Sequence, residues 1–229
     1  PPSEPADRST MSDTSLAPLP HAAPEGSTTR LEAFSDGVFA IAITLLVLEI
    51  RLPPETEIEH LGGLAAALLG LWPSYAGYAI SFATVGIMWA NHHEVIRLMA
   101  RVDHGLMVWN LLLLMAISFT PFPTAVMAEH LPHPGWDRNV AVAFYCGSFT
   151  LTAVFYNLLW RHAAKGRRLI HAHVSDERVR SITRAYIPGT FIYALATATA
   201  TVSVPAALAL VAGLALFYIL PRRGALTRE

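Results

Sequence analysis

Long apolar stretches, separated by short charged or proline-rich segments, make up most of the chain after its first 29 residues. One crossing of a bilayer takes about 20 predominantly apolar residues, and these stretches approach or exceed that length. We expect six membrane-spanning helices, at residues 31–50, 62–90, 105–128, 139–160, 185–202 and 205–221. The pattern therefore predicts an all-α membrane protein with six transmembrane helices per subunit.

The last two of these helices are the shortest. No Asp, Glu, Lys or Arg occurs between Arg184 and Arg222, a run too long for one crossing but suitable for two. Residues 203–205 divide this run, because Ser203 can cap a helix and Pro205 fits the first turn of the next one. A re-entrant hairpin is the alternative arrangement for this pair.

The composition agrees with a membrane location. Hydrophobic residues make up 53% of the 229 residues and charged residues only 14%, with a mean hydropathy of +0.42. A water-soluble fold of this size would have too little polar surface at that balance, so the soluble classes are excluded. Cys146 is the only cysteine, which rules out a disulfide within the chain and a thiolate metal cluster.

Basic residues gather on one side of the expected bundle, and this sets its orientation. Only Arg51 and Arg138 fall on the other side, so the positive-inside rule predicts a multi-pass protein of the cell (plasma) membrane with both termini cytoplasmic. The opposite side carries acidic residues, either ordinary solvated loops or a field that concentrates cations: Glu55, Glu57, Glu59, Glu129 and Asp137. The basic connection at residues 161–184 does not indicate nucleic acid, because no stacking aromatics alternate with its arginines.

The chain divides into three parts by composition. Residues 1–29 are rich in Pro, Ser, Thr and Ala, and we expect a disordered cytoplasmic N-terminal extension there. Residues 30–221 form the six-helix transmembrane domain, and residues 222–229 are a short cytoplasmic tail.

Three polar residues stand in the mouth of the first apolar helix: Arg30, Ser35 and Asp36. An ionisable group at membrane depth is a functional candidate, although Asp36 as a simple helix-end residue is the alternative. Arg30 and Asp36 lie about 240° apart around a helix, so each needs another partner. We expect a hydrogen-bonded network that holds the first helix in place, with partners among Asn91, His92, His93, Asp103 and Asn110.

The histidines do not form a recognisable metal motif. His92 and His93 are adjacent and point in different directions around a helix, unlike ligands at i and i+4. Haem ligation by histidines of facing helices is conceivable, but no histidine lies in the middle of an expected span. We therefore expect no cofactor and no bound metal other than a permeating ion.

An apolar stripe follows along the same first helix. Ile41, Leu45 and Leu48 stand at i, i+4 and i+7, with Thr44 beside them. Most such stripes pack against lipid or neighbouring helices. A hydrophobic constriction can also gate ions by dewetting, in which case Thr44 offers oxygens to a partly dehydrated cation.

Several motifs together resemble those of a known family. They are Arg30-x-x-x-Phe34-Ser35-Asp36 with the following residues 37–44, then Asn91-His92-His93, and then Ser118-Phe119-x-Pro121-Phe122-Pro123-Thr124. Over about residues 30–221 the chain resembles the prokaryotic branch of the transmembrane protein 175 family of potassium channels. The resemblance implies a six-helix subunit without the usual potassium filter, and a tetrameric channel around a single pore lined by the first helix.

The resemblance also implies roles for individual residues. Ile41 would form the narrowest hydrophobic ring, Leu45 and Leu48 further rings outward, and Thr44 a selectivity layer tied to potassium preference. A structural signature network would comprise Arg30, Phe34, Ser35, Asp36, Asn91, His92, His93 and Asn110. The long N-terminal extension departs from the family pattern.

The function expected from these features is passive conduction of K⁺ across the membrane by a homotetramer, without enzymatic activity. Other monovalent cations are possible permeant ions, and the lipid bilayer is the surrounding partner. The alternative is a cation- or proton-coupled secondary transporter in which Asp36 and the histidines relay protons, but residues 30–128 and 139–221 show no convincing inverted repeat. A haem or quinone membrane enzyme is a further alternative, which a Soret band would reveal.

Overall fold

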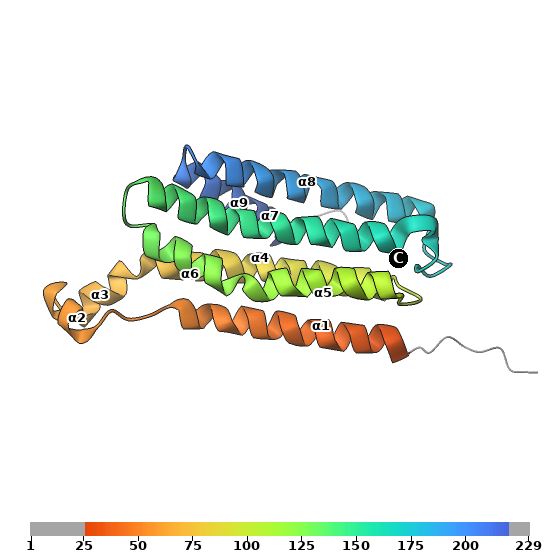
Figure 1. The fold of residues 1–229 in the computed structure, drawn as a ribbon, viewed down its shortest axis with the longest axis horizontal. Coiled ribbons are helices and arrows are strands. Elements are labelled where there is room, and N and C mark those ends of the chain that lie inside the picture. Colours follow the sequence, from red (N-terminus) through yellow and green to blue (C-terminus); the bar gives the residue numbers. More distant parts are fainter. Residues whose placement is uncertain (1–25, 220–229) are drawn as a thin grey trace, which may run out of the picture.

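The computed structural model describes residues 26–219, and within them it contains α-helices and short 3-10 turns but no strand. The long helices lie side by side and alternate in direction along the chain (Figure 1). The elements are α1 (Gly26–Leu45) with η1 (Leu46–Glu49), α2 (Glu55–His60), α3 (Leu64–Gly70), α4 (Trp72–Arg97), α5 (His104–Phe119), α6 (Pro121–His130), α7 (Trp136–Ala164), η2 (Lys165–Arg167), α8 (Asp176–Ala200) and α9 (Val204–Ile219). The all-α prediction is confirmed.

Three stretches of this bundle are long and apolar enough to cross a membrane on length and composition alone. They are residues 28–49, 104–130 and 136–167, and α9 is a shorter apolar helix. The other expected crossings coincide with α4 and α8, which lie outside these three stretches. The α8 helix has 25 residues and runs along the bundle, which favours a crossing over a re-entrant hairpin (Figure 1).

Two of the expected helices are divided. The predicted helix at 62–90 begins as α3, breaks at Leu71 and restarts as α4, which continues to Arg97. The predicted helix at 105–128 begins as α5, which ends at Phe119, and after Thr120 it continues as α6 from Pro121. Proline has no backbone N–H to give to the preceding turn, so it fits the start of a new helix better than the middle of one.

The first helix begins earlier than the sequence predicted. The α1 helix begins at Gly26, so it includes the last four residues of the expected extension. The predictions for residues 1–25 and for the tail at 222–229 lie outside the described residues.

The core of the subunit is built around α7, which packs against α5, α6, α8 and α9. Tyr145, Phe149 and Trp160 of this helix are fully buried. The Tyr145 hydroxyl also lies 3.0 Å from Ser81 Oγ, which is 2.9 Å from Thr124 Oγ1. This buried chain of hydroxyls joins α4, α6 and α7 and gives each polar group a partner.

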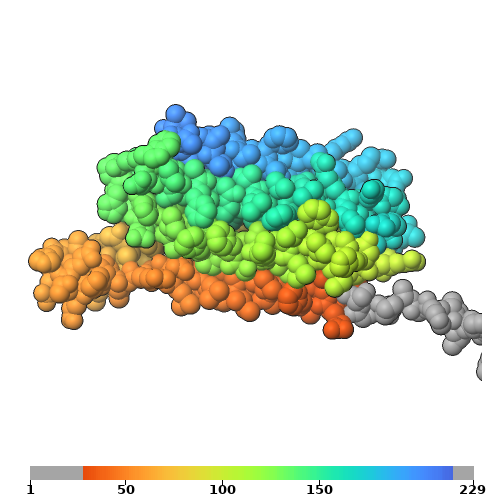
Figure 2. Space-filling view, viewed as in Figure 1, coloured from red at the N-terminus to blue at the C-terminus, as the bar shows by residue number. Residues whose placement is uncertain are grey.

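The first helix is peripheral by comparison. It packs chiefly on α4 and α5. In the space-filling view α1 forms one long outer edge of the molecule (Figure 2). One side of α1 therefore faces outward along its length.

The loop between α4 and α5 is fastened to the loop between α7 and α8. The backbone N–H of Ala100 donates to the Leu169 carbonyl at 2.8 Å, and that of His171 donates to the Leu98 carbonyl at 3.0 Å, around an isolated bridge between Met99 and Ile170. These bonds join two connections at the same end of the bundle.

Asp103 adds side-chain contacts at this junction. It caps α5 by accepting a hydrogen bond from the Leu106 N–H at 2.7 Å, and it lies 2.9 Å from His162 Nε2 and 3.0 Å from Arg168 Nη2. Burial alone would raise the pKa of Asp103, but the Leu106 N–H, the His162 ring and the Arg168 charge together hold the pKa below its ordinary value.

Removing the Asp103 side chain should therefore destabilise this end of the bundle. We expect Asp103→Ala to lower the free energy of unfolding by about 1 kcal/mol more than Asp103→Asn, because asparagine keeps the helix cap. The carboxylate stabilises the fold above its ordinary pKa of about 4 and stops doing so as the pH falls through the lowered value. Unfolding curves in micelles between about pH 6 and pH 3 should show a weaker acid dependence in Asp103→Asn. Equal stability of both variants at neutral pH would contradict the capping role.

Candidate functional site

The outward face of α1 and of η1, to which Leu48 belongs, carries the apolar stripe found in the sequence. The exposed fractions are 60% for Ile41, 40% for Leu45 and 63% for Leu48, and Thr44 is exposed beside them. Thr44 Oγ1 donates to the Ile41 carbonyl at 2.9 Å, which holds the hydroxyl against the helix while its oxygen stays accessible. The α5 helix covers one flank of this stripe, where Ile41 and Leu45 border a groove with Leu111 and Met115. The rest of the stripe is exposed.

The opposite face of α1 is buried. Ser35, Phe39, Ala42 and Leu46 recur at helical spacing and are at most 1% exposed. The Phe39 ring contacts His92 of α4, with 5.4 Å between ring centroids. The rotation of α1 about its own axis is therefore set by packing on α4 and α5.

A buried polar chain joins α1 to both of these helices. The Asn110 amide of α5 donates to Ser35 Oγ at 3.0 Å, and Ser35 Oγ donates to the Leu31 carbonyl at 2.8 Å. His92 Nε2 of α4 lies 2.8 Å from Asn110 Oδ1. Because a carbonyl oxygen only accepts, His92 must carry its proton on Nε2 here. Ser35, His92 and Asn110 are all fully buried.

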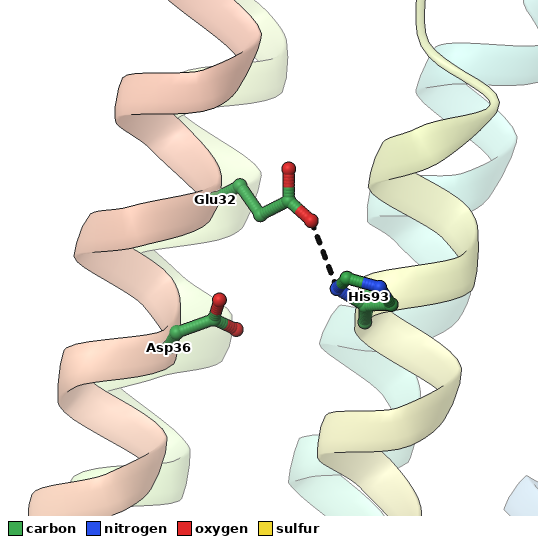
Figure 3. A group of neighbouring side chains, drawn as sticks. All are labelled: Glu32, Asp36 and His93. Carbon is green, nitrogen blue, oxygen red and sulfur yellow. Dashed lines mark ion pairs between the residues drawn. The ribbon is translucent and has the colours of Figure 1, made fainter.

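A second group lies nearer the start of α1. Glu32 Oε1 is 2.8 Å from His93 Nδ1, and Asp36 lies one helical turn further along α1 on the same side (Figure 3). The indole N–H of Trp89 donates to Asp36 Oδ1 at 2.9 Å. Asp36 thus finds its partner on α4 and not in Arg30.

Four other residues named from the sequence do not join these contacts. Arg30 and Phe34 are exposed, and Arg30 makes no ion pair within residues 26–219. Asn91 faces the other side of α4, where it lines a cavity of about 60 Å³ between α4, α7, α8 and α9. Asp103 belongs to the loop junction described above.

Two residues of the site were not named from the sequence, Glu32 and Trp89. Glu32 precedes Asp36 by four residues, so the two share a helix face. Trp89 precedes His93 by four residues, and their ring centroids are 6.2 Å apart. The four-residue spacings show from the sequence that each pair shares one helix face. They do not show that these faces of α1 and α4 lie against each other.

Acidic side chains surround a hollow at the other end of the molecule. Glu49, Glu57 and Glu129 line a cavity of about 620 Å³, together with Arg51, which pairs with Glu49 at 3.1 Å. The negative charge predicted for this side is therefore gathered near the C-terminal end of α1.

Known proteins are similar to this chain over most of its length. A family model described as endosomal/lysosomal potassium channel TMEM175 matches residues 30–121. A potassium channel of Chamaesiphon minutus is 49% identical over 183 residues, which cover 80% of this chain and 89% of that protein. A potassium channel of Streptomyces collinus is 44% identical over 191 residues, covering 82% of this chain and 90% of that protein.

A solved structure agrees with these matches. The crystal structure of a lysosomal potassium-selective channel TMEM175 homolog from Chamaesiphon minutus superposes with a TM-score of 0.77 at 45% identity, covering 85% of this chain and 97% of that chain. The family match includes the first helix and the polar contacts behind it. This chain belongs to the TMEM175 family of potassium channels.

Proposed function

We propose that this protein is a potassium-permeable channel in which four copies surround one pore lined by α1. The observation that carries the proposal is the exposed apolar stripe of α1, beside a helix face that is firmly packed on α4 and α5. One subunit supplies one such stripe, and closed rotational symmetry is the usual way to bring identical surfaces onto an axis. The names of the similar proteins from Chamaesiphon minutus and Streptomyces collinus support potassium as the permeant ion.

In this arrangement Ile41 forms the narrowest hydrophobic ring, and Leu45 and Leu48 form further rings toward the acidic end. Ile41 and Leu48 are more than half exposed in the subunit, and Leu45 is less so. A narrow apolar ring resists filling by water and so resists ions. Thr44 forms the selectivity layer, because its exposed oxygen is available to a cation that has lost part of its hydration shell.

The polar contacts between α1 and the helices α4 and α5 hold this stripe in a fixed orientation. In the proposed signature network Ser35, His92 and Asn110 fix the rotation of α1, while Asp36 and His93 fix its inner end. Arg30 and Phe34 take part through contacts that a single subunit does not contain, whereas Asn91 faces the cavity between α4, α7, α8 and α9 and stays outside this network. Conduction is passive, with no chemical step and no organic cofactor.

The proposed topology places six crossings in the plasma membrane, with both termini cytoplasmic. The start of α1 lies at the same end of the bundle as the α4–α5 and α7–α8 connections, and α9 runs back from the opposite end toward it (Figure 1). That end also carries Arg97, Arg101 and Arg168, as the positive-inside rule requires of a cytoplasmic surface.

Flux from potassium-loaded liposomes tests the proposal. Vesicles that contain the purified protein should lose K⁺ down its gradient without any second ion gradient, whereas protein-free vesicles should not. Transport that needs an imposed proton or sodium gradient would contradict a channel and favour a coupled transporter.

Thr44 should affect selectivity more than conduction. We expect Thr44→Ala to reduce the preference for K⁺ over Na⁺ by about two- to fivefold, equivalent to about 0.4–1 kcal/mol, because the hydroxyl oxygens are lost while the apolar rings remain. Reversal potentials in bi-ionic K⁺/Na⁺ conditions measure the change. Thr44→Ser keeps the hydroxyl and is the matched control. If Thr44→Ala and Thr44→Ser retain the same preference as the wild type, Thr44 is not the selectivity layer.

A further inference from the structure

Three potential metal ligands meet where the start of α1 faces α4. Glu32 and Asp36 are four residues apart on α1, and His93 projects toward them from α4 (Figure 3). One donor atom from each lies within 4.8 Å of the others. We propose that Glu32, Asp36 and His93 bind a divalent transition-metal ion that joins α1 to α4.

The donor set favours a transition metal over the hard cations. One imidazole nitrogen with two carboxylate oxygens is a combination that Zn²⁺ accepts, usually with water as a fourth ligand. Mg²⁺ and Ca²⁺ prefer sites made of oxygen alone. With a neutral imidazole the three side chains carry two negative charges, which a divalent ion neutralises.

The distances leave room for an ion after small side-chain rotations. Ligand atoms on a tetrahedral Zn²⁺ are about 3.3 Å apart, given bond lengths of about 2.0–2.1 Å. Glu32 Oε1 and His93 Nδ1 are now 2.8 Å apart, so they would separate slightly while Asp36 moves inward. Glutamate has three side-chain torsions, and Glu32 is only partly buried, so it can make this adjustment.

The Nδ1 atom of His93 lacks a well-formed hydrogen bond within residues 26–219. Nδ1 is inaccessible to solvent and makes no hydrogen bond of acceptable geometry with the described residues, although Glu32 lies close to it. The carboxylate is near the ring nitrogen but is not aligned with it. A metal ion would use this buried lone pair, which the simple pairing of Glu32 and His93 does not.

The surroundings resemble the outer shell of a metal site. Trp89 donates to Asp36 Oδ1 and leaves Asp36 Oδ2 available to an ion, and outer hydrogen bonds of this kind orient ligating carboxylates. Neither Arg30 nor Arg97 pairs with Glu32 or Asp36 in the described part of the chain. The negative charge of the two carboxylates is therefore still available.

Binding to purified protein in detergent, freed of any polyhistidine tag, tests the site without reference to ion flux. We expect calorimetric titration with Zn²⁺ to show one saturable site per subunit, and Co²⁺ to give the strong visible absorption of a low-coordinate complex. His93→Gln and Glu32→Gln should each weaken binding by about tenfold or more, since even outer-shell partners of metal sites typically contribute 10–100-fold. Mg²⁺ and Ca²⁺ should not compete.

Two exposed neighbours provide matched controls. Glu94 follows His93 on α4, and His104 begins α5. Glu94→Gln and His104→Gln should bind Zn²⁺ like the wild type. The proposal is overturned if the wild type shows no saturable binding, or if the double variant His93→Gln with Glu32→Gln keeps it. Failure of this test leaves the channel proposal untouched, because K⁺ flux is measured separately.

Discussion

Replacing Ile41 with asparagine should increase passive K⁺ leak from liposomes by about tenfold or more. In the proposed pore every copy of the chain contributes this residue to the narrowest ring, so one substitution changes the whole constriction. Asparagine has a similar length but hydrogen-bonds to water, and a barrier lowered by about 1.4 kcal/mol corresponds to a tenfold faster rate. Discrimination among K⁺, Na⁺ and Cs⁺ should weaken in the same variant.

Leu151→Asn is the control for this measurement. Leu151 lies near the middle of α7 and is 49% exposed, so it also presents an apolar side chain to the surroundings at mid-helix depth. The control should leave the leak unchanged, because α7 is not proposed to reach the pore. If Ile41→Asn leaks no more than Leu151→Asn, α1 does not form the constriction.

Replacing Asn110 with leucine should give the second large effect, a loss of about 1–3 kcal/mol in the free energy of unfolding. Leucine has a similar volume but cannot donate to Ser35 or accept from His92, so the fully buried His92 loses the partner of its Nε2. Unfolding by SDS in mixed micelles measures the loss, and the oligomer fraction from size-exclusion chromatography should fall in parallel.

Asn91→Leu is the matched substitution on α4. Asn91 makes no hydrogen bond to α1 and lines the small cavity on the other side of α4, so its replacement should change stability by less than about 0.5 kcal/mol. Equal losses for the two asparagines would mean that the chain from Ser35 to His92 has no special role in holding α1.

The helical architecture follows from sequence because apolar stretch length is a direct physical requirement of the bilayer. The positions of the helix ends were harder to predict from the sequence. Arg97 still belongs to α4 because a charged side chain at a helix end can remain in the polar boundary region. The break at Pro121 falls inside an apolar run, where hydropathy gives no signal and only the missing backbone N–H marks it.

The residues of the candidate site could be predicted in part from the sequence. Ser35, His92 and Asn110 were named as polar groups of similar depth, and the structure brings them together. Trp89 was missed because a tryptophan in an apolar helix reads as core or interface, and its N–H finds Asp36 only once α1 and α4 are docked. Asn91 and His92 differ by about 100° around α4, so their different surroundings depend on a helix rotation that spacing alone does not supply.

The bridge between Met99 and Ile170 joins the α4–α5 loop to the α7–α8 loop through backbone atoms. Its hydrogen bonds run between backbone atoms of Leu98, Ala100, Leu169 and His171 and so do not depend on side-chain chemistry. The exposed position 100 can therefore change freely, whereas Leu169 is buried in the core and has to stay apolar. Proline is the exception at 100 and 171, because each of those residues donates its N–H. The exposed side chains of these loops can therefore differ in chemistry while the backbone bonds keep the helices beneath joined.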